Sequence, residues 1–320
     1  MSKKTLLLAP FFLKVIENHI AGDPMNERIR WIKLTREEVS TLMKSEGISV
    51  SRNIIGKLLK AHDFVKRKMR NKLSCGSFPE RSQQFEVIHD KLEQFKDSPN
   101  PVLSMDTKKK EPLGRLYRSG KVYCSQAIEV YDHTNDCLIE GNVVPHGIYD
   151  LKTGNAWINI GTTHETAEFL CDSLRLWWKN YGKAAYPQAQ EILIFCDAGG
   201  ANSWRINVFK VELQKLCNVI GIKVTICHYP PYASKWNPIE HRVFPHVSRA
   251  MEGVMLESHE QLQSLIERTT TKTGLRVKVN IIRKTYNTGR VVAKEALNYI
   301  NIKYGDIVSG LNYSITPKET

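Results

Sequence analysis

The 320-residue chain lacks the patterns that mark several protein classes. Its seven cysteines are scattered, with no C-x-x-C pair and no Cys/His cluster at zinc spacing, which indicates reduced thiols in a cytoplasmic protein. Glycine and proline number only 19 and 13, which excludes a collagen-like or low-complexity chain. No apolar run approaches the roughly 18 residues of a membrane span, so we expect no membrane partner.

The start of the chain carries the one candidate targeting signal. Two lysines precede the apolar run 6–13, but Pro10 and Lys14 interrupt this pattern and no small-x-small cleavage site follows. The pattern therefore argues against secretion and favours a cytoplasmic location.

The chain also has fewer acidic than basic residues. The chain has 46 Lys and Arg against 33 Asp and Glu, a formal net charge of +13. Residues 1–100 hold 19 basic and 12 acidic residues, so positive charge is about twice as dense there as in the remainder. A surplus of this size suggests an anionic polymer as partner and, for DNA, association with the nucleoid.

A pair of short helices is predicted in this basic part. Residues 35–44 have a capping Thr35, acids in the first turn and an apolar helical face, and Gly47 ends the helix. Ser51 can cap a second helix with a basic outer face. This arrangement is typical of a helix-turn-helix, with a plain αα-hairpin as the alternative. The outer-face residues expected to contact DNA are Arg52, Asn53, Lys57 and Lys60.

A basic linker follows. Its cations either track DNA phosphates or form a solvated face; they include Lys66, Arg67, Lys68 and Arg70. An amphipathic helix is predicted at 85–95, and the turn 97–101 breaks the chain. We therefore predict a small all-α DNA-binding region at 1–97 and a second domain at 98–320.

Strand and helix patterns alternate in the second domain. Strands are predicted at 102–105, 123–131, 142–149, 156–160, 192–196 and 223–228, and helices at 163–181, at 203–220 and from 238. Residues 192–196 are continuously apolar, as in a strand buried on both faces. The order predicts an α/β fold, a mixed sheet flanked by helices.

Two aspartates follow apolar strands in the same way. Asp106 comes after residues 102–105, and Asp197 after residues 193–196. If these strands are neighbours, about 4.8 Å apart, both carboxylates point into one crevice at the carboxyl ends of the strands. Two carboxylates so close repel each other unless cations lie between them, and Mg²⁺ is the natural cation.

Glu240 supplies a third carboxylate. Asn237 is a good helix cap, Pro238 suits the first helical position, and Glu240 falls in the first turn. Two interpretations remain open: a capping-box glutamate that serves Asn237, or a third metal ligand beside the two aspartates.

With these residues in place, the chain resembles the DDE transposases of bacterial insertion sequences, in particular the ISAzo-type group. The resemblance spans about 100–285, and the region from Gly22 also looks like that group. The stretches that carry it are SMDTKKKE at 104–111, HGIYDL at 146–151, GTTHETAEF at 161–169, DAGGAN at 197–202, KVELQKL at 210–216, CHYPP at 227–231, SKWNPIEHR at 234–242 and TTTKTGLR at 269–276.

The resemblance implies a ribonuclease H-like catalytic domain with Asp106, Asp197 and Glu240 as its metal-binding triad. It further implies two Mg²⁺ ions, for which Mn²⁺ can substitute, and cleavage of DNA at the element's terminal inverted repeats. The freed 3′-hydroxyl would then attack target DNA. Since two ends must be brought together, a homo-oligomer on double-stranded DNA is expected.

Several residues around the triad have two interpretations. Lys108, Lys109 and Lys110 either hold flanking phosphates or form a solvated loop, and Lys235 is a further candidate DNA contact. His228 and Asn237 are possible auxiliary residues. His228 could assist a proton transfer or contact DNA, although a single histidine there is more often structural.

Two departures from the group bear on function. Ala198 replaces the first of three glycines that usually follow the second aspartate. The relatives also carry an additional N-terminal DNA-binding segment, so we expect recognition of the terminal repeats to be incomplete. Alternative hypotheses are therefore a truncated or domesticated DNA-binding relic without chemistry, and a nuclease acting on RNA·DNA hybrids.

Overall fold

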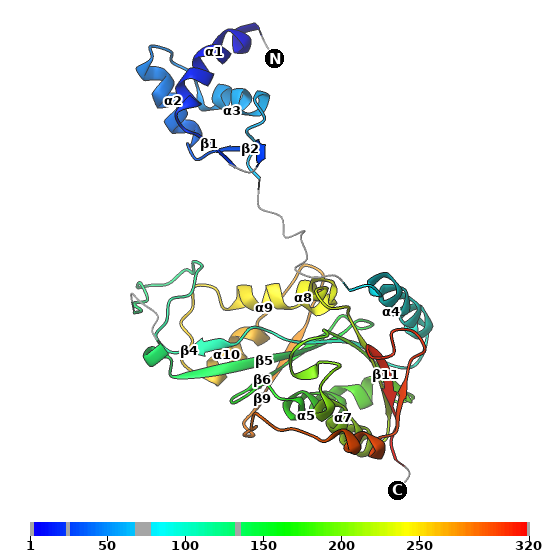
Figure 1. Ribbon diagram of the computed structural model, residues 1–320. Helices are drawn as coiled ribbons and strands as arrows, with labels where there is room; N and C mark the ends of the chain where they lie inside the picture. Colours follow the sequence, from blue (N-terminus) through cyan, green and yellow to red (C-terminus); the bar gives the residue numbers. More distant parts are fainter. Residues whose placement is uncertain (1–2, 24–25, 68–77, 132–135, 319–320) are drawn as a thin grey trace. The chain divides into compact units, whose positions relative to one another are not determined.

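The computed structural model describes residues 3–23, 26–67, 78–131 and 136–318. The chain forms two compact units, Met1–Leu73 and Ser74–Thr320 (Figure 1). Within the described part of the chain, no helix has the length and apolar character needed to cross a membrane.

The N-terminal unit packs three helices around one small core. They are α1 (Lys3–Glu17), α2 (Arg36–Ser45) and α3 (Arg52–Ala61). The core buries Phe12, Ile16, Val39, Met43, Ile55 and Leu58. The predicted capping of α2 is confirmed, because the Thr35 hydroxyl accepts the Glu38 amide and the Glu38 side chain accepts the Thr35 amide.

This unit is not all-α, which corrects the predicted fold in one respect. Strands β1 (Ile20–Asp23) and β2 (Asn26–Ile32) form an antiparallel hairpin that pairs Ile20 with Ile32. Both side chains pack against the helical core. The ladder satisfies the backbone groups of this segment while its two isoleucines cover the helices.

The C-terminal unit is built on a mixed sheet, as predicted. The order of its strands is β10-β11-β8-β7-β3-β5-β6-β9, and β4 pairs with β5. Neighbours β3, β7 and β8 are parallel, whereas β5 runs antiparallel to β3. The strands are β3 (Val102–Thr107), β4 (Glu111–Leu113), β5 (Gly141–Asp150), β6 (Ala156–Gly161), β7 (Glu191–Cys196), β8 (Lys223–His228), β9 (Val277–Ile282), β10 (Ile302–Tyr304) and β11 (Asn312–Ile315).

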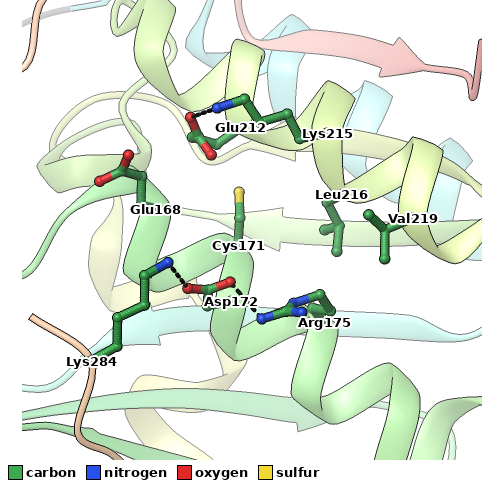
Figure 2. A pocket seen from close by; sticks show the side chains of 9 residues that line it. All are labelled: Glu168, Cys171, Asp172, Arg175, Glu212, Lys215, Leu216, Val219 and Lys284. Atoms are coloured by element: carbon green, nitrogen blue, oxygen red, sulfur yellow. Dashed lines mark hydrogen bonds and ion pairs between the residues drawn. The ribbon is translucent and has the colours of Figure 1, made fainter. Parts of the chain in front are cut away.

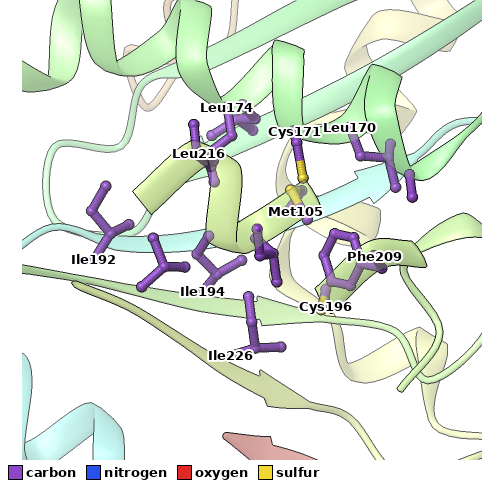
Figure 3. Close-up of a cluster of buried hydrophobic side chains, with 14 of the residues drawn as sticks. Met105, Leu170, Cys171, Leu174, Ile192, Ile194, Cys196, Phe209, Leu216 and Ile226 are labelled. Atoms are coloured by element: carbon purple, nitrogen blue, oxygen red, sulfur yellow. The ribbon is translucent and has the colours of Figure 1, made fainter. Parts of the chain in front are cut away.

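Helices cover both faces of this sheet. On one face, α5 (Ala167–Trp177) and α7 (Asn207–Ile220) pack on apolar side chains of the central strands, among them Met105 and Ile194 (Figure 3). On the other face, α8 (Pro238–Arg242), α9 (Phe244–Ala250) and α10 (His259–Glu267) enclose a second core. The remaining short elements are η1 (Asp136–Leu138), η2 (Trp178–Gly182), α6 (Lys183–Ala185), η3 (Gly200–Asn202), η4 (Ser234–Trp236) and η5 (Lys294–Tyr299).

The predicted amphipathic helix near residue 90 forms, but it belongs to the C-terminal unit. Helix α4 (Arg81–Lys96) buries Ile88 and Phe95 in a cluster with strand residues of the sheet. Its Gln84 side chain donates to the backbone oxygen of His228 at 2.7 Å. The units therefore divide at 73/74 instead of the predicted 97/98, because the apolar face of α4 packs on the sheet.

Two further local predictions need correction. The segment 123–131, predicted as a strand, has no regular structure: its side chains are largely exposed, and no strand of the described ranges pairs with it. The helix predicted from 163 begins at Ala167, where the Thr166 hydroxyl accepts the Phe169 amide as N-cap. Strand β8 matches its predicted bounds.

Candidate active site

The two aspartates meet at one edge of the sheet. Strands β3 and β7 are parallel neighbours, and their register pairs Met105 with Cys196. Asp106 and Asp197, the next residue of each chain segment, therefore lie at the same level. The adjacency of the two strands, which the sequence analysis assumed, is confirmed.

Glu240 reaches this pair from the first turn of α8. The capping-box interpretation is excluded by geometry, since the Asn237 side chain makes no capping hydrogen bond. The Glu240 side chain instead shares a hydrogen bond with Asp106. Pro238, at the start of the helix, helps to fix the direction of this turn. The three carboxylates therefore form one cluster.

The cluster carries strong electrostatic strain. Burial, the charge of Asp197 and the hydrogen bond with Glu240 raise the pKa of Asp106 to about 9. Burial also raises the pKa of Asp197 to about 6, although a hydrogen bond from Asn237 opposes this shift. A cation bound between these carboxylates would relieve this repulsion.

The donor set fits a hard divalent cation, which prefers carboxylate oxygens. In their present positions, no three such side chains within the described ranges are arranged to coordinate one ion. Asp106, Asp197 and Glu240 are the residues that could hold metal.

A buried amide joins the three carboxylate-bearing segments. The Asn237 side chain is fully buried, and its Nδ2 atom donates to the Asp197 carboxylate at 3.2 Å and to the Met105 carbonyl at 3.3 Å. Its Oδ1 atom accepts the Ser104 hydroxyl, whose oxygen accepts the Ile239 amide at 3.0 Å. Ser104 and Asn237 thus tie α8 to β3 and to Asp197. Sequence analysis named Asn237 as auxiliary but missed Ser104, two residues before Asp106 on the same strand face.

Gly147 provides the space for this arrangement. It lies opposite Asp106 in the β3–β5 register. A Cβ atom at this position would lie 2.6 Å from Ile239 Cδ1 and 2.8 Å from Phe244 Cε1. Helices α8 and α9 can therefore approach β5 closely only because residue 147 has no side chain. The HGIYDL stretch contained this glycine, but nothing local to the sequence shows what faces it.

The family model described as "Rhodopirellula transposase DDE domain" matches residues 12–317. The chain belongs to this family of DDE transposases. The resemblance stated from the sequence is confirmed, and the chain is an enzyme of DNA transposition and recombination. A search of curated proteins finds no match.

Solved structures of Mos1 transposase show distant similarity to this transposase. A paired-end complex with the left transposon end has a TM-score of 0.43 at 10% identity, covering 80% of this chain and 68% of that chain. A mariner Mos1 paired-end complex with Mg has a TM-score of 0.44 at 11% identity. The Mos1 mariner paired-end complex with Mn has a TM-score of 0.42 at 12% identity. The last two comparisons cover 72% of this transposase and 65% of the other chain.

His228 of the transposase lies beside the cluster but within the core. Its ring is fully buried, and Nδ1 lies 2.9 Å from the backbone oxygen of Asp197. Burial lowers the pKa of His228 to about 4, so the ring is neutral at physiological pH. A buried neutral ring that holds the Asp197 backbone is suited to positioning and offers no surface to DNA.

The predicted DNA-binding lysines near the triad differ in availability. Lys108 forms a largely buried ion pair with Glu111, which also accepts Arg118 at 2.6 Å, so the Lys108 ammonium is already bound within the protein. Lys109, Lys110 and Lys235 are exposed.

In the N-terminal unit, the predicted DNA-binding side chains of α3 and of the segment after it face solvent. The exposed ones are Arg52, Asn53, Lys57, Lys60, Lys66 and Arg67. Arg52 also pairs with Glu37 at 3.2 Å on the surface. Lys68 and Arg70 lie outside the described residues.

A cavity of about 350 Å³ lies between α5 and α7 (Figure 2). These helices pack with Met105, whose side chain points to the opposite sheet face from that of its neighbour Ser104. Its acids are paired with cations of the chain itself. Asp172 accepts Lys284 at 2.8 Å and Arg175 at 3.0 Å, while Glu212 accepts Lys215 at 2.9 Å. These carboxylates are already neutralised, unlike those of the Asp106 cluster.

Proposed function

We propose that the transposase cuts double-stranded DNA at the terminal inverted repeats of its element and joins the freed ends to target DNA. Asp106, Asp197 and Glu240 would hold two Mg²⁺ ions, and Mn²⁺ would substitute. The observation that carries this proposal is the convergence of three half-buried carboxylates at the carboxyl ends of β3 and β7 and the first turn of α8.

The protein's own contribution is positioning and charge. Two bound divalent cations would supply activation of the attacking oxygen and neutralisation of charge on the scissile phosphate. The carboxylates fix where the cations lie, and the Ser104–Asn237 bonds fix the carboxylates relative to one another. Water would be the first attacking group and the freed 3′-hydroxyl the second, with no covalent bond to protein.

Two sets of exposed basic side chains would bind DNA, one in each unit. In the N-terminal unit, the exposed basic face of α3 fits insertion of this helix into the major groove. Exposed Lys109, Lys110 and Lys235 would contact backbone phosphates near the catalytic centre. Joining two ends calls for a homo-oligomer on DNA, acting at the nucleoid.

Metal-dependent cleavage of DNA that carries the element's ends tests the proposal. We expect Asp106→Asn, Asp197→Asn and Glu240→Gln each to reduce single-turnover cleavage under Mg²⁺ by at least about 10³-fold. Glu267→Gln, an exposed acid on α10, is the matched control and should cleave like the wild type.

Three outcomes would contradict the proposal. Cleavage without metal, or cleavage that survives all three substitutions, would remove the triad from the chemistry. Tight DNA binding with no nicking under Mg²⁺ or Mn²⁺ would support the relic hypothesis. Cleavage of RNA·DNA hybrids without binding to duplex DNA would favour the hybrid nuclease.

A further inference from the structure

One aromatic side chain beside the proposed catalytic centre is largely exposed to solvent. Trp236 is 55% exposed, whereas its neighbour Asn237 is fully buried. The backbone at this point is held firmly, because the Trp236 amide donates to Ala233 at 2.9 Å and the Asn237 amide to Ser234 at 2.8 Å. The ring therefore projects from a fixed position into solvent.

Trp236 belongs to a short row of aromatic rings and cations. Its ring meets that of Phe85, on α4, edge to face at 5.9 Å between centroids. Lys235 Nζ lies 5.8 Å from the centre of the Trp236 ring, and Arg81 lies 5.7 Å from that of Phe85. Within the described residues, neither cation forms an ion pair with an acid. We call Arg81, Phe85, Lys235 and Trp236 the aromatic row.

Another residue of the same loop shows a similar feature. Tyr232 is 60% exposed and holds a left-handed backbone conformation, with φ of 62°. This conformation is strained for a residue with a bulky side chain. The loop between β8 and α8 thus presents two large rings to solvent next to the carboxylate cluster.

The row lies close to the catalytic carboxylates. The Cα atoms of adjacent residues are about 3.8 Å apart, and the residue after Trp236 donates from its side chain to the Asp197 carboxylate at 3.2 Å. The ring is therefore within reach of a strand whose phosphate lies at the triad, a few nucleotides from that phosphate.

We propose that Trp236 is a stacking platform for an unpaired base of the DNA strand beside the cleaved phosphate. Lys235 and Arg81 contact the phosphates on either side of this base. The inference rests on the proposed function, because it takes DNA as the ligand of the triad.

The chemistry of the row favours this ligand. Exposed aromatic rings combined with unpaired cations are the usual surface for single-stranded nucleic acid. Inside a duplex, neighbouring base pairs cover both faces of each base, so a ring can stack only on an unpaired or terminal base. An apolar protein partner would leave both cations without a counter-charge.

The experiment uses the full chain and dT₁₂ with one central 2-aminopurine, whose fluorescence is quenched by stacking. Binding is measured in Ca²⁺, a poor cofactor for this type of hydrolysis, and the same probe is also tested as a duplex. We expect Trp236→Ala to weaken single-strand binding on the order of 10-fold and to relieve quenching, with little change for duplex. Trp236→Phe should restore most of both signals.

Tyr299→Ala is the matched control, because Tyr299 is 74% exposed in the same unit and lies outside the row. It should bind like the wild type, and thermal melting checks that all variants fold. Unchanged quenching in Trp236→Ala, or equal losses for single strand and duplex, would overturn the proposal. A changed oligomeric state with unchanged quenching would identify the ring as a protein contact and overturn it as well.

The design separates this inference from the proposed function. If Trp236→Ala loses quenching while the wild type cuts no DNA under Mg²⁺, the stacking site stands and the catalytic proposal fails. If Trp236→Ala keeps quenching while wild-type cleavage requires the triad, the stacking site fails and the catalytic proposal stands.

Discussion

Gly147→Ala tests whether the close approach of α8 to β5 positions Glu240, the proposed catalytic glutamate. The new Cβ would lie 2.6 Å from Ile239 Cδ1 and 2.8 Å from Phe244 Cε1, against 3.4–4 Å for ordinary contact. Ile239 is fully buried and Phe244 nearly so, so neither can move without displacing its helix or repacking the core. The carbons must separate by roughly 1 Å to restore ordinary packing.

Both stability and rate should respond. Overpacking a core costs about 1–3 kcal/mol, which lowers the melting temperature of a unit of this size by several degrees. Because Ile239 precedes Glu240 directly, the same shift moves the Glu240 carboxylate, which we propose to be catalytic. A displacement of about 1 Å can cost on the order of 100-fold in rate, which single-turnover cleavage at saturating protein would measure.

Gly161→Ala separates the two effects. The new Cβ atom would lie 2.9 Å from the Phe169 ring, an overlap comparable to that at residue 147. This overlap lies between β6 and α5 and does not involve α8. We expect a similar loss of stability with cleavage close to that of the wild type. Wild-type cleavage by Gly147→Ala, or an equal loss of cleavage in Gly161→Ala, would refute the positioning argument.

Two further predictions concern the carboxylate cluster. Burial, the charge of Asp197 and the hydrogen bond with Glu240 raise the pKa of Asp106 to about 9. The free energy of unfolding should therefore fall as the pH rises from about 4 toward 9, because the unfolded chain loses this proton at a lower pH than the folded protein. Without metal, Asp106→Asn should therefore melt at a higher temperature than the wild type, and the difference should be larger at pH 7.5 than at pH 5. Addition of Mg²⁺ should stabilise only the wild type. A lower melting temperature for the variant without metal would contradict this prediction. Asn237→Ala removes the bonds that hold Asp197 and the Ser104 hydroxyl, so we expect Mn²⁺ affinity to fall by about 10- to 100-fold in a titration. Asn280→Ala, which breaks a 3.1 Å bond to Asn159 in the same sheet, should leave Mn²⁺ affinity unchanged, and equal losses in the two variants would show a general effect of folding.

The local sequence pattern was sufficient to predict the two strands that carry the aspartates. An apolar run followed by an acid marks the end of a buried strand, and β3 and β7 are such strands. Their adjacency could only be assumed, because pairing across about 90 residues leaves no local signal. The α8 start was also predicted, but whether Asn237 capped its helix or turned inward depended on Ser104, 133 residues away.

The predictions that differ from the structure also depend on contacts between residues that are distant in the sequence. The apolar face of α4 was recognised, but the sequence does not show which unit it packs against, so the domain boundary was placed after the helix instead of before it. Lys108 had two interpretations, a phosphate contact or part of a solvated loop, and the sequence could not show that it pairs with Glu111, which also binds Arg118. Residues 123–131 have strand-like composition, but without a neighbouring strand they form none.

Binding of Mn²⁺ to the transposase on DNA carrying the element's ends tests the central claim most directly. Electron paramagnetic resonance can count the bound ions in the wild type and in Asp106→Asn, with Glu267→Gln as control. The account predicts two ions per active site in the wild type and the control, and a loss of bound metal in Asp106→Asn. No bound Mn²⁺ in the wild type, or an undiminished number in Asp106→Asn, would contradict the assignment of these carboxylates as the catalytic metal site.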